Sequence, residues 1–403
     1  MKMRASKRVF TAKGFTLVEL LLGSSILLVV IIGTLALFER SNKISVDQTR
    51  FSEVQHNVRS AMYFVSRDAR MAGVGLIPDI TGYAVEGQDA FSPAPEAADS
   101  LKLMGNFDDP VALRIENYQG SSVQAKIYDS DLIDTPFQCP EFFENKIIFV
   151  MSTRCPGCYA FRFIDEGKLQ GCDGAGNAHV IVPPGRGPGI NPPGGLSDTF
   201  CNDDCWDDAI ITIAQIKYYW LDTTGNSDDY STIANLDAAH GYIGGSGSTP
   251  RNPNVLYLST DNGSGTAQHM PLAMNIENLQ FQYNGDYLIP SDGVLDGFTD
   301  WDPAWTILST DNDADRQTKR ERLAKLSQIR IQILGRTDQP YLTVSKSPVT
   351  DVHLYRRPAL SNSPAATSPD PKVPPDDWRR RFLLESTATI RNNAIVIYNT
   401  GQH

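Results

Sequence analysis

A long apolar segment near the N-terminus constrains this chain more than any other feature. It runs from Phe15 to Phe38, and its 24 residues would form a helix about 36 Å long. A bilayer core about 30 Å thick needs about 20 residues, so the segment is long enough to cross a membrane. The apolar region of a secretory signal peptide is shorter, about 7–15 residues, and precedes a small-residue cleavage site. We therefore predict a membrane-spanning helix.

The charges on either side of this segment predict its orientation. Five cationic residues and no acidic residue occupy the first fourteen positions, whereas only Arg40 and Lys43 follow closely after the segment. Because Lys and Arg accumulate on the cytoplasmic side, we expect a cytoplasmic N-terminus and an external body. The formal charge is −11, to which the first fourteen residues contribute +5, so the remainder carries −16. Such an acidic body repels phosphate backbones, which argues against nucleic-acid binding.

Glu19 is the one charged residue inside the apolar segment. An ionised carboxylate in a bilayer costs several kcal/mol unless it finds a partner. One interpretation places Glu19 close enough to the interface to remain hydrated. The other pairs it with a cation from a neighbouring chain in an assembled state. Cleavage between Gly14 and Phe15 would create such a cation, the new amino terminus of Phe15.

The motif around Glu19 carries a family resemblance. Lys13-Gly14-Phe15-Thr16-Leu17-Val18-Glu19 follows a basic leader and opens the long apolar helix. In this it resembles the class III signal of type IV prepilins and type II secretion pseudopilins. The resemblance implies that a prepilin peptidase cleaves after Gly14, removes residues 1–14 and N-methylates Phe15. It also implies that Glu19, the fifth residue of the mature chain, takes part in subunit assembly.

A helical pattern continues beyond the apolar segment. Gly73, Gly75 and Pro78 then favour a helix end. The pattern predicts one helix of about 55 residues, with residues 15–38 in the membrane and residues 39–74 packed on a globular head. A separate coiled coil is disfavoured, because the apolar stripe lasts barely three heptads. That stripe recurs mostly at spacings of three and four and comprises Ile44, Phe51, Val54, Val58, Ala61, Met62, Val65 and Ala69.

Residues 75–403 are predicted to form a β-rich head with long loops. The chain would then have an α+β fold, a long N-terminal helix packed on an antiparallel sheet. Polar and apolar residues alternate in Gln328–Gly335, as in a strand with one solvated face. Residues 135–208 contain the cysteines and are interpreted as an insertion. The predicted strands are Val111–Glu116, Val123–Tyr128, Lys146–Met151, Tyr159–Ile164, Val180–Val182, Ile210–Leu221, Asn278–Tyr283, Gln328–Gly335, Phe382–Ile390 and Ala394–Tyr398.

Two short segments of the head narrow the group of proteins that the chain resembles. Asn275–Tyr283 reads Asn-Ile-Glu-Asn-Leu-Gln-Phe-Gln-Tyr, and Arg379-Arg380-Arg381-Phe382 precedes Ile390-Arg391-Asn392 near the end. Considered alone, they indicate a sheet strand and an exposed basic turn before the last strand. In this order, behind the N-terminal helix, they resemble the head of PilW-type minor pilins. The resemblance implies a structural subunit that helps initiate a type IV pilus or is incorporated into it after processing.

Location and partners follow from the same resemblance. It implies a single-pass inner-membrane protein with a cytoplasmic N-terminus and a periplasmic head, which then enters the extracellular pilus. The implied partners are the prepilin peptidase, the inner-membrane assembly platform, other minor pilins and the major pilin. A large pseudopilin of a type II secretion system shares the N-terminal signal but is usually shorter. A pilus-tip adhesin, whose loop-rich head binds a surface ligand, is an alternative of a different class.

Six cysteines all lie between residues 139 and 205. Cys155-Pro156-Gly157-Cys158 has the spacing of a redox-active dithiol, as in a membrane-anchored thiol oxidoreductase, and Cys201 with Cys205 would complete a zinc site. Tyr159–Phe163, however, predicts a strand and not the helix that follows a redox motif. Outside the cytoplasm, disulfides are the natural state. We therefore predict disulfides, in a pairing that the sequence leaves open, among Cys139, Cys155, Cys158, Cys172, Cys201 and Cys205.

Residues 292–315 are rich in aspartate. Asp311, Asp313 and Asp315 alternate as in a calcium loop, but arginines stand where an EF-hand needs its glycine and its glutamate. We interpret the stretch as a solvated acidic loop, with an irregular calcium site as the alternative. The six histidines are scattered, and the sequence contains no recognisable hydrolase triad or phosphate-binding loop. We accordingly predict no enzymatic activity and no cofactor.

Overall fold

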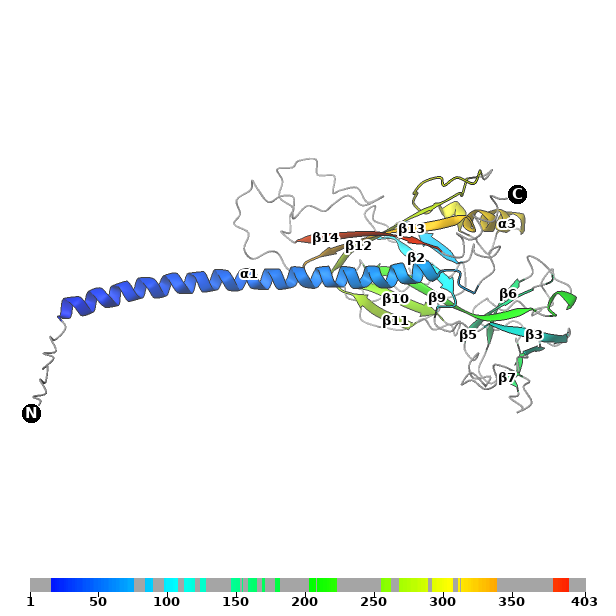
Figure 1. Ribbon diagram of the computed structural model, residues 1–403, viewed down its shortest axis with the longest axis horizontal. Helices are drawn as coiled ribbons and strands as arrows, with labels where there is room; N and C mark the ends of the chain where they lie inside the picture. The colour runs from blue at the N-terminus through cyan, green and yellow to red at the C-terminus, as the bar shows by residue number, and fades with distance from the viewer. Residues whose placement is uncertain are drawn as a thin grey trace, which may run out of the picture.

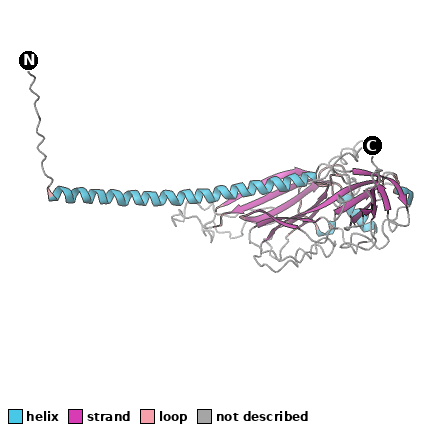
Figure 2. Ribbon diagram, turned by 90° about the horizontal axis from the view of Figure 1, so that it is seen from below, coloured by secondary structure: helices cyan, strands magenta, loops and turns pink. Residues whose placement is uncertain are grey.

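The computed structural model contains one long helix followed by two antiparallel sheets, which confirms the predicted α+β class (Figure 1). The arrangement combines a long stalk with a β-rich head, as Figure 2 shows from below. The residues described are 16–75, 84–89, 98–107, 112–119, 124–127, 146–152, 154, 159–164, 169–170, 178–181, 203–207, 209–222, 255–261, 268–288, 292–306, 311, 313–338 and 380–390.

Helix α1 spans Leu17–Met71, and its 55 residues match the predicted length. At its end, Gly73 and Gly75 have φ angles of 77° and 80°, in the left-handed region that favours glycine. The second half carries the predicted apolar stripe, which is buried from Val54 to Ala69. The first half extends beyond the strands of the head as a stalk (Figure 2). One continuous helix therefore has an exposed first half and a second half that packs on the head.

The larger sheet is organised around β9, Ile210–Asp222. The first part of β9 pairs with β3 and β5, and the second part pairs with β2 and β10. All these pairings are antiparallel, so β9 joins two groups of strands into one sheet of eleven. The other strands of this sheet are β1 Val85–Gln88, β2 Ser100–Gly105, β3 Ala112–Gln119, β4 Gln124–Ile127, β5 Lys146–Met151, β6 Tyr159–Ile164, β7 Leu169–Gln170, β8 Ala178–Ile181, β10 Val255–Asp261 and β11 Gln268–Ala273.

The smaller sheet has the order β12-β13-β14 and consists of Ile276–Gly285, Leu326–Arg336 and Arg381–Thr389. Helix α1 packs on all three strands and also contacts β2 and β11 of the larger sheet. It therefore runs between the two sheets (Figure 1). In β13 the predicted alternation is present: Ile329 and Ile331 are fully buried, whereas Arg330 between them is half-buried.

Most of the strand predictions are confirmed. Strands β5 and β6 coincide with their predicted bounds, whereas Ala394–Tyr398 lies outside the described residues. The sequence did not predict the division into two sheets, nor strands β1, β2, β7, β10 and β11. In β2 all six residues are buried, the charged Lys102 included, so its burial does not follow the polar-apolar alternation of Ser100–Leu103. Strand β11 contains Pro271, and a proline inside a short segment argues against predicting a strand there.

Residues 292–315, which were predicted to form a solvated acidic loop, are not a loop throughout. Their last part opens helix α3, Asp313–Leu323, and η5, Pro303–Trp305, precedes it. Arg320 and Arg322 in its last turn suit the helix dipole, as does Asp315 in its first turn. Asp311 pairs with Lys319 at 2.7 Å, and Asp302 accepts the backbone N–H of Ala304. Among the residues described, no three His, Cys, Asp or Glu side chains are grouped to hold a metal ion.

Gly335 in β13 marks a close approach between α1 and the smaller sheet. A Cβ atom at this position would lie 2.5 Å from Val58 Cγ2 and 2.7 Å from Val54 Cγ1. Both valines are fully buried. The absence of a side chain at Gly335 therefore allows α1 to lie directly on the backbone of β13.

We predict that Gly335→Ala destabilises the head by about 1–3 kcal/mol, because the added methyl group would overpack a filled core. Val58→Ala should also destabilise the head by itself. In the double variant Val58→Ala makes room for the new methyl group, so the two losses should be less than additive. Thermal unfolding of the detergent-solubilised chain measures all three. Strict additivity would show that the two residues are not in contact.

Candidate functional site

The first half of α1 presents an apolar surface to its surroundings. Its large apolar side chains are exposed, by between 45% at Ile31 and 76% at Leu17. The most apolar window of eighteen residues has a mean hydropathy of 2.6, and none of it is buried. By length and composition this half is able to cross a membrane. A soluble monomer rarely exposes a contiguous apolar surface of this kind, which is consistent with a membrane-anchored protein.

Glu19 has a partner within its own chain that the sequence analysis did not consider. Thr16 is the N-cap of α1, and its backbone N–H and side-chain hydroxyl both donate to Glu19 Oε2, at 3.0 and 2.9 Å. In return, the backbone N–H of Glu19 donates to Thr16 Oγ1 at 3.3 Å. This is a capping box, which satisfies amide groups that a helix start leaves unbonded. Gly14 and Phe15 themselves lie outside the described residues.

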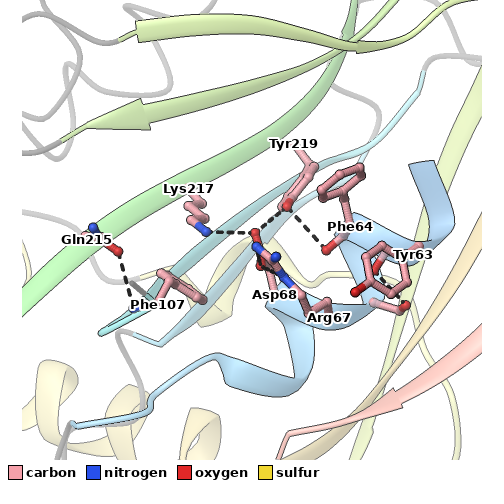
Figure 3. Close-up of polar contacts among 9 residues, drawn as sticks. Tyr63, Phe64, Arg67, Asp68, Phe107, Gln215, Lys217 and Tyr219 are labelled. Atoms are coloured by element: carbon pink, nitrogen blue, oxygen red, sulfur yellow. Dashed lines mark hydrogen bonds and ion pairs between the residues drawn. The ribbon is translucent and has the colours of Figure 1, made fainter. Parts of the chain in front are cut away.

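A buried ionic cluster attaches the second half of α1 to β9 (Figure 3). Asp68 on the helix is fully buried, and its Oδ2 lies 3.0 Å from Lys217 Nζ and 2.6 Å from Tyr219 Oη. Arg67 binds the other carboxylate oxygen at 2.9 Å. Burial, and next the negative charge of Asp68, raise the pKa of Tyr219. The Tyr219 hydroxyl therefore stays protonated and donates to Asp68.

Sequence reasoning missed this cluster, although a signal for it was present. Asp68 lies between Val65 and Ala69, two members of the buried stripe. Lys217 is the one charged residue between Ile210 and Leu221, in an otherwise largely apolar strand. A buried charge is rare unless it is paired, so an acid and a base in two buried elements predict contact between these elements.

The two head segments on which the PilW resemblance depends contact each other. Glu277 of β12 and Arg381 of β14 are 104 residues apart in sequence, yet they form a two-pronged ion pair at 2.7 and 3.1 Å. Arg336 of β13 approaches the same carboxylate at 3.5 Å. Only 8% of the Arg381 side chain is exposed, so the interpretation of this position as an exposed basic turn is wrong. The three residues form a row across the smaller sheet.

The rest of the basic segment packs on α1. The ring of Phe382 meets the ring of Phe51 edge to face, with 6.5 Å between the centroids. The guanidinium of Arg380 lies 5.4 Å from the centre of the Phe51 ring, and that of Arg59 lies 5.8 Å from the Phe382 ring. These contacts combine apolar burial with attraction between a cation and an aromatic face. They attach the start of β14 to the helix.

Of the six cysteines, the part of the chain that the structure describes includes Cys205. It ends the short helix η4, Asp203–Cys205, is buried, and is disulfide-bonded. Its carbonyl oxygen accepts a hydrogen bond of 2.6 Å from Ser152 Oγ, just after β5. Cys139, Cys155, Cys158, Cys172 and Cys201 lie outside the described residues, so the pairing remains a prediction.

Comparison with known proteins adds little to this description. No family model and no curated protein matches the chain. A type IV-like pilin from Thermus thermophilus is a structural neighbour, with 12% sequence identity and a TM-score of 0.17. The match covers 44% of this chain and 79% of the pilin. A similarity this low carries no argument about function. The class of the protein therefore rests on its own elements, an exposed apolar helix continuous with a β-rich head.

We predict that Asp68→Ala destabilises the head by about 3–5 kcal/mol, because it leaves Lys217 buried without its carboxylate. The double variant Asp68→Leu/Lys217→Met removes both charges and should regain much of this loss. Tyr219→Phe removes one hydrogen bond to a charged group and should cost less, about 1.5–3 kcal/mol. Chemical denaturation of the solubilised chain gives these values. A double variant no more stable than Asp68→Ala would contradict the pairing.

Proposed function

We propose that the chain is a minor pilin, a structural subunit that helps initiate a type IV pilus or is built into it. In this proposal residues 1–14 are a leader, 15–38 the membrane and filament-core helix, 39–74 its continuation and 75–403 the periplasmic head. The observation that carries the proposal is the two-part helix α1, which is exposed and apolar in its first half and packed on the head in its second. The prepilin-like motif at its start supports the same function.

The exposed half of α1 explains how such a subunit moves from membrane to filament. In the inner membrane, lipid tails surround the apolar side chains. In a filament, parallel apolar helices replace the lipid, so this surface need not contact water at any stage. Association within the membrane then depends on packing and polar contacts, because lipid tails are as apolar as the helices.

Glu19 supplies the polar contact in this proposal. Leader removal would create an amino terminus at Phe15, and N-methylation would leave it cationic. At an effective dielectric constant of about 20, opposite charges roughly 4 Å apart attract by about 4 kcal/mol before desolvation. A fraction of this energy favours the correct axial position of a subunit over a slipped one. The capping box supports the role, because it holds the Glu19 carboxylate at the end of the helix nearest to Phe15.

Leader processing gives the first test. Gly14→Val should leave residues 1–14 attached, because the bulkier side chain would not fit a cleavage site for glycine. The intact mass of the membrane-extracted protein distinguishes the two forms. For the wild-type chain we expect a mature protein that begins at N-methylated Phe15. A wild-type chain that begins at any other residue would contradict the proposal.

The charge of Glu19 is tested separately from its capping role. Glu19→Gln removes the charge but keeps an oxygen that accepts from Thr16, whereas Thr16→Val keeps the charge and breaks the box. We expect Glu19→Gln to be processed and inserted but to recover far fewer partner pilins from solubilised membranes. Thr16→Val should recover them nearly as well as the wild type.

Equal recovery by Glu19→Gln and the wild type would show that the charge has no pairing role. A loss with both variants would assign the effect to the helix start instead. The same pull-down separates the alternatives of similar architecture, because the recovered subunits belong either to a pilus or to a type II secretion system. Mass spectrometry of the recovered proteins identifies which.

A further inference from the structure

The described part of the chain leaves one face of α1 uncovered where the helix passes between the two sheets. The exposed residues of this face recur at spacings of three and four, which places them within an arc of about 80° on the helix. Tyr63, near the middle of this face, is 62% exposed. The face, which we call the basic stripe, consists of His56, Arg59, Tyr63, Arg67 and Arg70.

The charge of the basic stripe contrasts with that of the whole body. The stripe contains three arginines and no acid, whereas the chain after residue 14 carries −16. Arg67 already binds the buried Asp68, but 43% of its side chain is exposed. The ring of Tyr63 packs edge-on against Phe64, at 5.5 Å, which limits its movement. Tyrosine and arginine are, with tryptophan, among the residue types enriched at the centres of protein interfaces.

We propose that the basic stripe binds an acidic face on the head of a neighbouring subunit that stands parallel to this one. The inference rests on the proposed function. In that function the first half of α1 lies beside the same part of other subunits, so the subunits stand parallel. Packed helices lie about 8–10 Å apart. Because α1 is continuous, the heads above them stand side by side, and the basic stripe lies at the level of the adjacent head. A neighbour with the acidic composition of this chain has the complementary charge.

Anionic lipid is a poorer fit for the same arginines. Arg59 lies 21 residues beyond Phe38, about 32 Å along the helix from the end of the apolar segment. At physiological ionic strength the screening length is about 8 Å, so lipid headgroups at the membrane surface exert little attraction at this distance. A neighbouring head has no such separation. Charge complementarity of this kind chiefly selects the partner and speeds association.

Photo-crosslinking of the full-length chain in its native membrane tests the proposal. The photoreactive residue p-benzoylphenylalanine replaces Tyr63, and the adduct is identified by mass spectrometry. We expect an adduct with the head of another subunit that carries a pilin-type N-terminal helix. Arg59→Glu/Arg70→Glu should lower the yield about fivefold or more, the change expected for two exposed ion pairs. Arg70→Glu alone avoids the Arg59–Phe382 contact and should cause a smaller loss.

Matched controls distinguish the charge of the basic stripe from the net charge of the chain and from the exposure of the crosslinking position. Lys43→Glu/Arg154→Glu changes the net charge equally at side chains that are 48% and 50% exposed, and should leave the adduct unchanged. The crosslinker at Val294, which is 62% exposed like Tyr63, should give less of this adduct. The proposal is overturned by an adduct with phospholipid, by equal yields at both sites, or by a yield that both double variants leave unchanged.

A separate measurement shows whether the proposed function is wrong. The intact mass of the same preparations reports whether residues 1–14 are removed. A charge-dependent adduct with a neighbouring head, formed by a chain that retains its leader, supports the basic stripe and contradicts processing as a pilin. A processed chain without a charge-dependent adduct at Tyr63 overturns the basic stripe alone.

Discussion

The position of the head depends on the buried contact between Asp68 of α1 and Lys217 and Tyr219 of β9. All three side chains are almost completely removed from solvent. Replacing a buried ion pair by apolar residues is often neutral or stabilising, so the contact is weak evidence for stability. The short distances in this contact restrict the position of α1 relative to β9 more than apolar packing does. A shift of the helix by one turn, about 5.4 Å, would break both contacts and leave opposite charges buried apart.

Two members of the buried stripe of α1 reinforce this position by steric means. Val54 and Val58 lie against the backbone at Gly335, where no other residue type would allow the same approach. Phe51 meets Phe382 on the same side of the helix. The helix is therefore held by charge against one sheet and by shape against the other. Because α1 has no break, a head fixed at Asp68 is also fixed relative to Glu19, about 74 Å away along the axis.

The sequence predicted those features that depend on local pattern. The length of α1 followed from an apolar run and a stripe of regular spacing, and β13 followed from alternation. Features that depend on contacts between distant segments were not predictable in this way. No local pattern indicates that Glu277 and Arg381 meet across β13, or that the strands divide into two sheets. Helix α3 was missed because the alternating aspartates at its start resemble a calcium loop, whereas acidic residues are also favoured in the first turn of a helix.

The two roles of Glu19 are compatible on physical grounds. A capping box usually stabilises a helix start that water would otherwise solvate. Inside a membrane no water replaces these hydrogen bonds, so the box matters most where the proposed subunit resides. A carboxylate can accept about four hydrogen bonds, and Thr16 contributes two, both at Oε2. A cation from a neighbouring chain therefore adds to the box and does not need to break it. The isolated subunit already holds the carboxylate in place, so assembly loses little conformational freedom when the proposed pair forms.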